Sequence, residues 1–306
     1  MAVKQTKIDL KLIKSLGGIE FLAKQVVEGF ITGLHKSPYH GFSVEFAEHR
    51  QYNTGESTRY LDWKVYNKTD RLFIKRFEEE TNLRCSILLD ISSSMYYPVE
   101  TNGKLNFSVL AAAAIAYMLQ KQRDAVSLTT FNSKVVYQSQ TKSTSLHLRE
   151  LFSELERTLN KKSEKETTSA YKVIDELAEK IHKRSLVVIF SDMFENFNEK
   201  DNLFNALKHL KHNQHEVLIF HVKDKMTEDD FAFDDKPYVF IDVESGERVK
   251  LNPVQIREYY KQTVQQFSQD LKIKCGQYKI DYIEVDINLD FKQVLLPFLL
   301  KRGKMI

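Results

Sequence analysis

The sequence has few cysteines and no long hydrophobic run. Only two of its 306 residues are cysteine, Cys85 and Cys275, which excludes a disulfide framework and matches no zinc-site spacing. Such sparse cysteine is typical of a reducing compartment, and residues 1–7 do not resemble a secretory signal, so we expect a cytoplasmic protein. The longest apolar run, residues 109–119, is alanine-rich and too short to span a bilayer. It is predicted to be a helix buried on most sides.

The chain also lacks an excess of charge of one sign. Its 45 basic and 42 acidic residues give a formal net charge of +3, so the composition does not indicate a nucleic-acid-binding surface. The sequence contains no internal repeat and no low-complexity linker. Its apolar content of 42% is enough for a sizeable core, which could form one large domain or a domain with an extension.

From residue 83 onward, apolar strand patterns alternate with helical patterns. Strands are predicted near 84–89, 125–131, 134–138, 185–191, 216–222 and 281–285. Helices are predicted near 105–123, 144–160, 169–183, 201–213, 254–272 and 290–301. This alternation predicts an α/β fold with a doubly wound, mostly parallel sheet covered on both faces. The short connection Asn132-Ser133 predicts a hairpin and therefore one antiparallel edge strand.

The first 82 residues have a different pattern. Residues 8–35 are helical in pattern, and Gly17-Gly18 divides them into two helices. Residues 36–82 are rich in aromatic, charged and turn residues, which predicts short strands or extended segments. We therefore predict an N-terminal segment over residues 1–82, packed on an α/β domain over residues 83–306. Within that domain, residues 224–252 are predicted to be a polar insertion with a hairpin near 239–242 and 247–249.

Oxygen-bearing side chains follow two of the predicted buried strands. Asp90 ends the first strand, and Ser92 and Ser94 follow it in a D-x-S-x-S pattern. Asp192 follows the strand near 185–191 in the same way. Open α/β sheets bind ligands at the carboxyl ends of their strands. One carboxylate and two hydroxyls on a tight loop suit Mg²⁺, or Mn²⁺, which keeps other positions for water or a partner.

A threonine before the helix near 169–183 completes the predicted set of donors. Thr167 and Thr168 both place a hydroxyl at the helix start; Thr168 fits better, and Thr167 stays open. The predicted metal ligands are Asp90, Ser92, Ser94, Thr168 and Asp192. In this chain order they resemble the metal-ion-dependent adhesion site of von Willebrand factor A domains. Each residue alone could be an ordinary loop or cap residue, so the prediction depends on the whole set.

A series of motifs runs from the middle segment into the first strand-end aspartate. In order, they are GFSVEF (41–46), RQY (50–52), GESTRYLDWK (55–64), RLFIKRFEEE (71–80) and DISSSM (90–95). Their succession resembles the bacterial family catalogued as domain of unknown function fifty-eight, over nearly the whole chain from about residue 30. The resemblance implies a von Willebrand A-like fold and a gene neighbourhood shared with MoxR-type AAA+ ATPases. It also implies an adaptor role in the maturation or assembly of other proteins.

Three functions remain open on the sequence alone. The first is a protein-binding module in which the metal ion accepts an Asp or Glu from a partner, either a MoxR-type ATPase or its client. The second is a metal-dependent hydrolase or phosphatase-like enzyme. Such phosphatases place a proton-donating acid two residues after the aspartate, whereas this chain has Ser92 there, which favours the binding module. The third is a metal-free structural scaffold.

The middle segment has two competing interpretations. Arg59, Asp62, Trp63 and Arg71 could form a docking surface, since arginine and tryptophan are frequent at binding hot spots. We prefer an internal brace, with an arginine paired to an acidic residue and Trp63 packed.

The histidines also have two interpretations. His209, His212 and His215 follow a three-residue spacing that could suggest a metal site. We prefer a solvated helix end, where such residues are favourable with the helix dipole. His221 lies within a strand pattern and is predicted to be a hydrogen-bonded core residue.

Overall fold

The computed structural model describes residues 18–33, 46–52, 61–77, 83–101, 103–161, 170–193, 200–242, 246–289, 291 and 295. The chain divides into two compact units. The larger unit comprises Met1–Gly33 together with Leu83–Ile306, and the smaller unit comprises Leu34–Asn82. The helix that begins at Ile19, which the sequence analysis assigned to the N-terminal segment, therefore belongs to the same unit as the predicted α/β domain.

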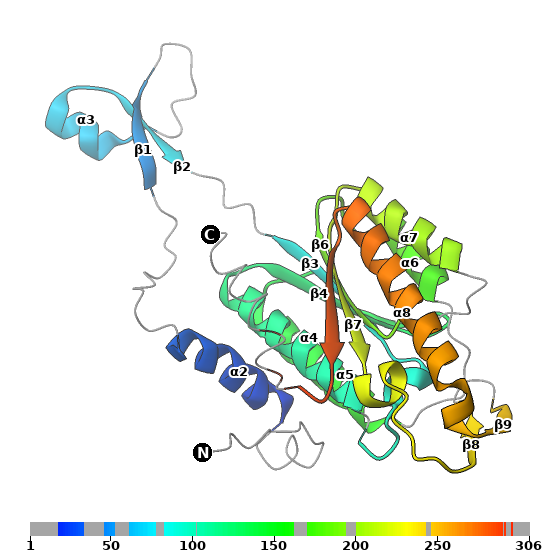
Figure 1. Cartoon of the computed structure of the whole chain (residues 1–306). Helices are drawn as coiled ribbons and strands as arrows, with labels where there is room; N and C mark the ends of the chain where they lie inside the picture. The colour runs from blue at the N-terminus through cyan, green and yellow to red at the C-terminus, as the bar shows by residue number, and fades with distance from the viewer. Residues whose placement is uncertain are drawn as a thin grey trace. The chain divides into compact units, whose positions relative to one another are not determined.

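A six-stranded sheet forms the centre of the larger unit (Figure 1). In spatial order its strands are β10 (Asp281–Asp286), β7 (Glu216–Lys223), β6 (Leu186–Ser191), β3 (Arg84–Asp90), β4 (Ala125–Phe131) and β5 (Val135–Gln138). Neighbouring strands are parallel except β4 and β5, which form an antiparallel pair at one edge. The chain moves outward from β3 in one direction and then from β6 in the other, as in a doubly wound sheet. The predicted fold class and antiparallel edge strand are confirmed.

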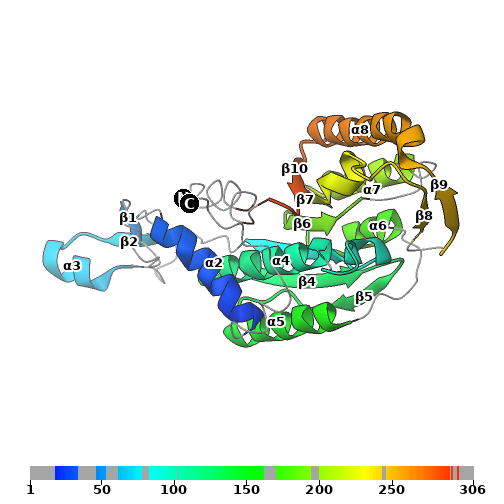
Figure 2. The same ribbon diagram turned by 60° about the horizontal axis from the view of Figure 1, so that its bottom comes forward.

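Helices cover both faces of this sheet, as Figure 2 shows. One face carries α4 (Gly103–Lys121), α5 (Ser145–Asn160) and α2 (Ile19–Gly33), and the other carries α6 (Ala170–Lys180), α7 (Lys200–His212) and α8 (Pro253–Gln277). Alternate side chains of β3 point to opposite faces of the sheet. Ile87 and Leu89 pack in the core under α2, α4 and α5, and Leu88 packs in the core under α6, α7 and α8. Strands buried on both faces explain the continuous apolar runs in the sequence.

Helix α4 is buried from Lys104 to Leu119, so it has no polar stripe. Its residues pack in the core together with residues of α2, α5 and the sheet. The alanine run at 111–114 has small side chains, which suits close packing on more than one side of the helix. The prediction of a helix buried on most sides is confirmed.

A glycine with a backbone conformation that favours glycine directly precedes helix α2. Gly18 has a φ of +96°, a conformation that favours glycine, and an added Cβ would lie 2.9 Å from Glu156 Oε1. The same carboxylate oxygen accepts a hydrogen bond from the Ile19 backbone N–H at 2.9 Å. A carboxylate of α5 therefore caps the start of α2. The predicted helix before Gly17 lies outside the described residues.

The polar insertion predicted after β7 contains a short π-helical turn and a hairpin. The turn is η4 (Lys225–Asp229), and the hairpin pairs β8 (Tyr238–Ile241) with β9 (Arg248–Leu251), which confirms the predicted hairpin. The ring of Phe231 stacks on that of Phe240 at 5.6 Å between centroids, which holds β8 against the preceding loop. The turn η4 was not predicted.

The smaller unit contains a two-stranded antiparallel sheet and one short helix among its described residues. The strands are β1 (Phe46–Gln51) and β2 (Phe73–Phe77), and the helix is α3 (Trp63–Thr69). Asp62 caps α3, because its Oδ1 accepts hydrogen bonds from the backbone N–H groups of Lys64 and Val65. Short strands were predicted for this region, and the strands found fit that description.

Neither cysteine forms a disulfide and both are buried, one in the central strand β3 and one in α8. Two sequence predictions cannot be compared with the structure. Thr167 and Thr168 lie outside the described residues, and so does the predicted helix at 290–301 apart from residues 291 and 295.

Candidate functional site

The order of the strands defines a switch point between β3 and β6. The chain leaves β3 toward β4 on one side, whereas β6 begins the other half of the sheet. Ligands of open α/β sheets bind at such a point, beyond the carboxyl ends of the strands. Asp90 is the last residue of β3, and Asp192 directly follows β6. The structure therefore brings together two predicted site residues that are 102 positions apart in the sequence, by subtraction of their numbers.

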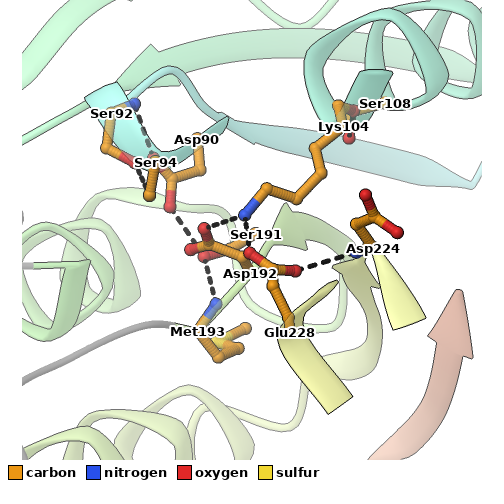
Figure 3. Close-up of polar contacts among 10 residues, drawn as sticks. All are labelled: Asp90, Ser92, Ser94, Lys104, Ser108, Ser191, Asp192, Met193, Asp224 and Glu228. Atoms are coloured by element: carbon orange, nitrogen blue, oxygen red, sulfur yellow. Dashed lines mark hydrogen bonds and ion pairs between the residues drawn. The ribbon is translucent and has the colours of Figure 1, made fainter. Parts of the chain in front are cut away.

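Asp90 is fully buried and held by neutral hydrogen-bond donors (Figure 3). The Ser191 hydroxyl donates to its Oδ2 at 2.6 Å, and the Ser92 backbone N–H donates to its Oδ1 at 2.9 Å. The Ser191 oxygen in turn accepts from the Met193 N–H at 3.0 Å, which orients that hydroxyl. Burial and, to a lesser extent, repulsion from Asp192 raise the pKa of the Asp90 carboxyl, the hydrogen bonds from Ser191 and Ser92 oppose the rise, and the net pKa is about 7.

Ser92 and Ser94 lie beside Asp90 at the start of η2 (Ser93–Tyr96). Their hydroxyl oxygens are 3.0 Å apart and both side chains are buried. Ser92 occupies the N-cap position of η2 without making a side-chain cap hydrogen bond. The two hydroxyls are therefore directed at each other near the strand end. The structure thus gathers four of the five predicted ligands on the loops that follow β3 and β6.

Asp192 is held by a cation that the sequence analysis did not identify. The Lys104 ammonium lies 2.8 Å from Asp192 Oδ2 and 2.6 Å from Glu228 Oε1, with only 1% of the lysine side chain exposed. Glu228 comes from η4, and its Oε2 accepts a hydrogen bond from the Asp224 N–H at 2.8 Å. Burial lowers the pKa of Lys104, but attraction to Asp192 and Glu228 outweighs burial, so the net pKa is raised.

Three residues of this site were missed by the sequence analysis: Lys104, Ser191 and Glu228. Lys104 gave only a weak signal, because a lysine at the start of a helix needs a buried carboxylate as partner only if the helix start is itself buried. Ser191 ends an apolar strand, where one polar residue is ordinary. Glu228 lies in a stretch with no periodic pattern, so the sequence gives no sign of its position.

Most of the chain matches the model of one protein family. The model of the family described as protein of unknown function DUF58 matches residues 48–270, which is more than half of the chain. The chain belongs to this family. The predicted family is confirmed, and the matched range contains every residue of the site described above.

One curated relative in the comparison is the uncharacterized protein Rv1480 of Mycobacterium tuberculosis. It is 29% identical over 110 residues, which cover 36% of this chain and 35% of the relative. The chain therefore spans about a third of the length of the curated relatives it matches. A protein of Mycobacterium bovis, Mb1516, matches over the same share.

Solved structures with a similar chain path include BatB from Bacteroides thetaiotaomicron and the SpRpn10 VWA domain. BatB is 12% identical with a TM-score of 0.42, covering 73% of this chain and 98% of BatB. The SpRpn10 domain is 12% identical with a TM-score of 0.36, covering 69% of this chain and 92% of that domain. The strand order and polarity of its own sheet define the fold of this DUF58 chain as doubly wound α/β with one antiparallel edge strand.

The donor set of the DUF58 site fits a hard divalent cation. Its carboxylate and hydroxyl oxygens are the atoms that Mg²⁺ and Mn²⁺ prefer. The repulsion between Asp90 and Asp192 is the cost that a cation between them would remove. Among the residues that the structure describes, no group of three or more histidine, cysteine, aspartate or glutamate side chains is placed to hold a metal. Any metal here would therefore depend on hydroxyl as well as carboxylate oxygens.

A cavity of about 680 Å³ opens beside Asp192. It lies between the ends of β6 and β7, the turn η4 and helix α8, and its walls include Ile256, Tyr260, Val264 and Phe267. Two of its charged lining residues are paired with each other: the Lys223 ammonium lies 3.0 Å from Asp229. The volume is within the usual range of small-molecule and peptide side-chain pockets. The cavity therefore adds an apolar surface to one side of the switch point.

The histidine predictions are partly wrong. His215 is 1% exposed, and its Nδ1 accepts a hydrogen bond from the Ser185 N–H at 3.3 Å, because the chain turns inward at Gln214, which has a φ of 62°. His209 lies at the partly exposed end of α7 and contacts Asp175 at 2.8 Å. His221 is buried and hydrogen-bonded to the Tyr282 hydroxyl, as predicted, and burial lowers its pKa to about 3.

The preferred interpretation of Trp63 is also wrong. Its side chain is 61% exposed and meets Tyr66 edge to face at 6.2 Å, so it is not packed as a brace. Asp62 caps α3 through its side chain. Arg59 lies outside the described residues.

The described helices give no candidate for a membrane span, since none combines enough length with enough hydrophobicity.

Proposed function

We propose that this chain is a protein-binding adaptor that contacts its partner through a divalent metal ion at the switch point. The proposed ligands to Mg²⁺ or Mn²⁺ are Asp90, Ser92, Ser94, Thr168 and, directly or through water, Asp192. The partner would supply an Asp or Glu side chain to a remaining coordination position. A cytoplasmic location, expected from the cysteine content, is part of the proposal.

One observation carries this proposal: two buried carboxylates face the switch point from adjacent parallel strands. Asp90 and Asp192 are 0% and 2% exposed, and each raises the cost of ionising the other. Folding buries ionised carboxylates only where other groups compensate their charge. The Lys104 ammonium contributes one positive charge on the Asp192 side, whereas the donors to Asp90 among the described residues are all neutral. A divalent cation near Asp90 would supply the missing charge.

The residues around Asp90 are suited to presenting an oxygen in a fixed direction. The Ser191 hydroxyl and the Ser92 N–H hold both carboxylate oxygens, so the side chain cannot rotate freely. Hydrogen bonds of this kind orient metal ligands and strengthen binding. Ser92 and Ser94 add hydroxyl oxygens on the same loop. When bound, the metal would supply a positive centre with an open position for a carboxylate.

The partner we propose is a MoxR-type AAA+ ATPase or a client protein of that ATPase. This part of the proposal rests on the family resemblance and on the preference of a hard cation for carboxylate oxygen. A carboxylate replacing one water on the metal keeps the octahedral geometry. Such a contact is short-ranged, so it should depend less on salt than a contact between exposed lysines and acids.

An enzyme is less favoured by the same geometry. The position two residues after Asp90 carries the Ser92 hydroxyl, whose proton is not acidic enough for general acid catalysis. His221, the histidine that lines the neighbouring cavity, stays neutral because burial lowers its pKa to about 3. The binding role needs no general acid or base, whereas the hydrolase alternative needs both. A metal-free scaffold is the remaining alternative, and metal titration separates it from the adaptor.

The experiment measures binding between the full chain and a purified MoxR-type AAA+ ATPase from the same genome. Biolayer interferometry would compare Mg²⁺ with EDTA, and wild type with a Ser92→Ala/Ser94→Ala double variant. The matched control is Ser86→Ala/Ser127→Ala, another pair of buried serines whose hydroxyls are 3.0 Å apart, across β3 and β4. We expect binding that needs Mg²⁺, is lost in the first variant and survives in the control.

Thermal unfolding would establish that both double variants fold. The scaffold alternative would be supported by a complex that survives both EDTA and the Ser92→Ala/Ser94→Ala change. A metal-dependent turnover of phosphate esters that disappears in Asp192→Asn would favour the hydrolase instead.

A further inference from the structure

We propose that Lys104 is an internal cation that competes with a divalent metal ion for Asp192 and thereby limits metal affinity. The inference rests on the proposed function, because it concerns the same metal site. It adds a residue that the adhesion-site pattern does not contain. It also links the switch point to the turn η4.

Lys104 has the geometry of a fixed counter-ion rather than of a surface lysine. It is the second residue of α4, and its side chain is 1% exposed. Its ammonium lies 2.8 Å from Asp192 and 2.6 Å from Glu228, which are 36 residues apart in the sequence, by subtraction of their numbers. Figure 3 shows Asp90 and Lys104 approaching Asp192 from different elements. The carboxylate of Asp192 therefore lies between the Lys104 ammonium and the carboxylate of Asp90.

A divalent cation and the Lys104 ammonium cannot share Asp192 at low cost. Both are positive, and charges this close repel strongly in a buried site. Metal binding that uses Asp192 should therefore require the ammonium to weaken its contact with that residue. Glu228 offers an alternative partner, since it already lies 2.6 Å from the ammonium and is itself held by the Asp224 N–H.

This arrangement predicts opposite effects for changes at Lys104 and at Glu228, the second carboxylate partner of Lys104. Removing the ammonium leaves Asp192 available to the metal, so affinity should rise. When Glu228 loses its charge, Asp192 is the one carboxylate partner left among those described for Lys104. The ammonium then holds Asp192 more strongly, so the affinity for the metal should fall. If Lys104 served folding alone, both changes would alter stability, but they would not shift the metal affinity in opposite directions.

The experiment measures the affinity of the full chain for Mn²⁺ alone, by isothermal titration calorimetry and by electron paramagnetic resonance of free Mn²⁺. The variants are Glu228→Gln, Lys104→Met and the double variant Lys104→Met/Glu228→Gln. The double variant loses one positive and one negative charge, so its net charge equals that of the wild type. It also leaves fewer buried charges unpaired than Lys104→Met, which makes it the variant expected to fold.

Lys223→Met is the matched control, because it removes one lysine charge from the Lys223–Asp229 pair in the same region without touching Asp192. We expect the double variant to bind Mn²⁺ about tenfold or more tightly than wild type, and Glu228→Gln to bind more weakly. Lys223→Met should change affinity by a smaller factor. Thermal unfolding without metal would confirm that each variant is folded.

Equal Mn²⁺ affinity in wild type and the double variant, or no binding by the double variant, would overturn the role of Lys104. A rise in Lys223→Met as large as in the double variant would also overturn it, because general charge would then explain the effect. Binding by the double variant but not by wild type would support the role of Lys104 and count against the metal-dependent adaptor. Metal-dependent partner binding with no effect of Lys104 would leave the adaptor intact.

Discussion

The carboxyl edge of the sheet and the helix α3 carry two different kinds of candidate contact. At the sheet edge, Asp90, Asp192 and Lys104 are almost completely buried, and each is held by specific partners. On α3, Trp63 is 61% exposed and touches Tyr66 only at a ring edge. Burying charged groups costs free energy that must be compensated, whereas exposing one aromatic ring costs little. The buried site therefore indicates a function more strongly than the exposed aromatic pair.

The first prediction tests the buried side of this comparison through stability. Lys104→Met leaves Asp192 and Glu228 as buried carboxylates without their ammonium, so it should destabilise the fold by about 3–5 kcal/mol. Urea unfolding followed by circular dichroism would measure the change. Adding Glu228→Gln should recover part of the loss. A change within about 0.5 kcal/mol, typical of a surface substitution, would mean that the triad contributes little.

The second prediction concerns pH. The pKa of Asp90 is about 7 in the folded state and about 4 in an unfolded chain, so between these values the folded state alone holds the proton. The contribution of Asp90 to stability should therefore fall as the pH rises from about 4 to about 7, by up to about 4 kcal/mol. Asp90→Asn should lack this decline.

The difference in unfolding free energy between wild type and Asp90→Asn would be measured across this pH range without divalent metal. Comparing the two proteins removes the contribution of other carboxyl groups. A difference that does not vary with pH would contradict the proposed environment of Asp90.

The third prediction tests metal binding directly. Asp90→Ala should lower Mn²⁺ affinity by about 100-fold or more, because it removes a main anionic ligand. The chain should stay folded, since the substitution removes the repulsion between Asp90 and Asp192 that exists when no metal is bound. Isothermal titration calorimetry would measure the affinity and thermal unfolding the stability. Unchanged affinity would place any metal elsewhere.

The smallest effect is expected on the exposed side. Trp63→Ala should change stability by no more than about 0.5 kcal/mol and leave Mn²⁺ affinity unchanged. If α3 also contacts the ATPase, the same change should weaken that complex, since exposed tryptophan is frequent at hot spots. Interferometry with the partner would measure this. A large loss of stability would restore the packing role that its exposure argues against.

The sequence was sufficient for the sheet and for the aspartates at its edge. Buried parallel strands give continuous apolar runs, so strands such as β3 and β6 and the aspartates after them are visible in one dimension. The alternation with helices then limits the order of the strands. Ser92 and Ser94 were found because they follow Asp90 on the same short loop.

The ion pairs of Lys104 with Asp192 and Glu228 could not be predicted in this way. Lys104 and Glu228 lie 124 residues apart, and only the folded chain brings them together. Glu228 sits in a π-helical turn within a polar stretch that lacks periodicity. His215 was misjudged for a related reason, because a turn at Gln214 takes it from the end of α7 into the interior. Whether a residue after a turn is exposed depends on the direction in which the chain leaves the turn, and the spacing of residues in the sequence does not reveal that direction.

The two buried thiols, neither of which is in a disulfide, allow local opening of the fold to be measured by chemical labelling. Cys85 lies in the central strand β3 and Cys275 near the end of α8, and both are 0% exposed. Burial also raises the pKa of the Cys275 thiol to about 12, so a thiol reagent can react only after the site opens. Release of α8 alone would expose Cys275, whereas Cys85 would require disruption of the sheet. Labelling rates followed by mass spectrometry would therefore rank how readily the wall of the cavity and the centre of the sheet come apart.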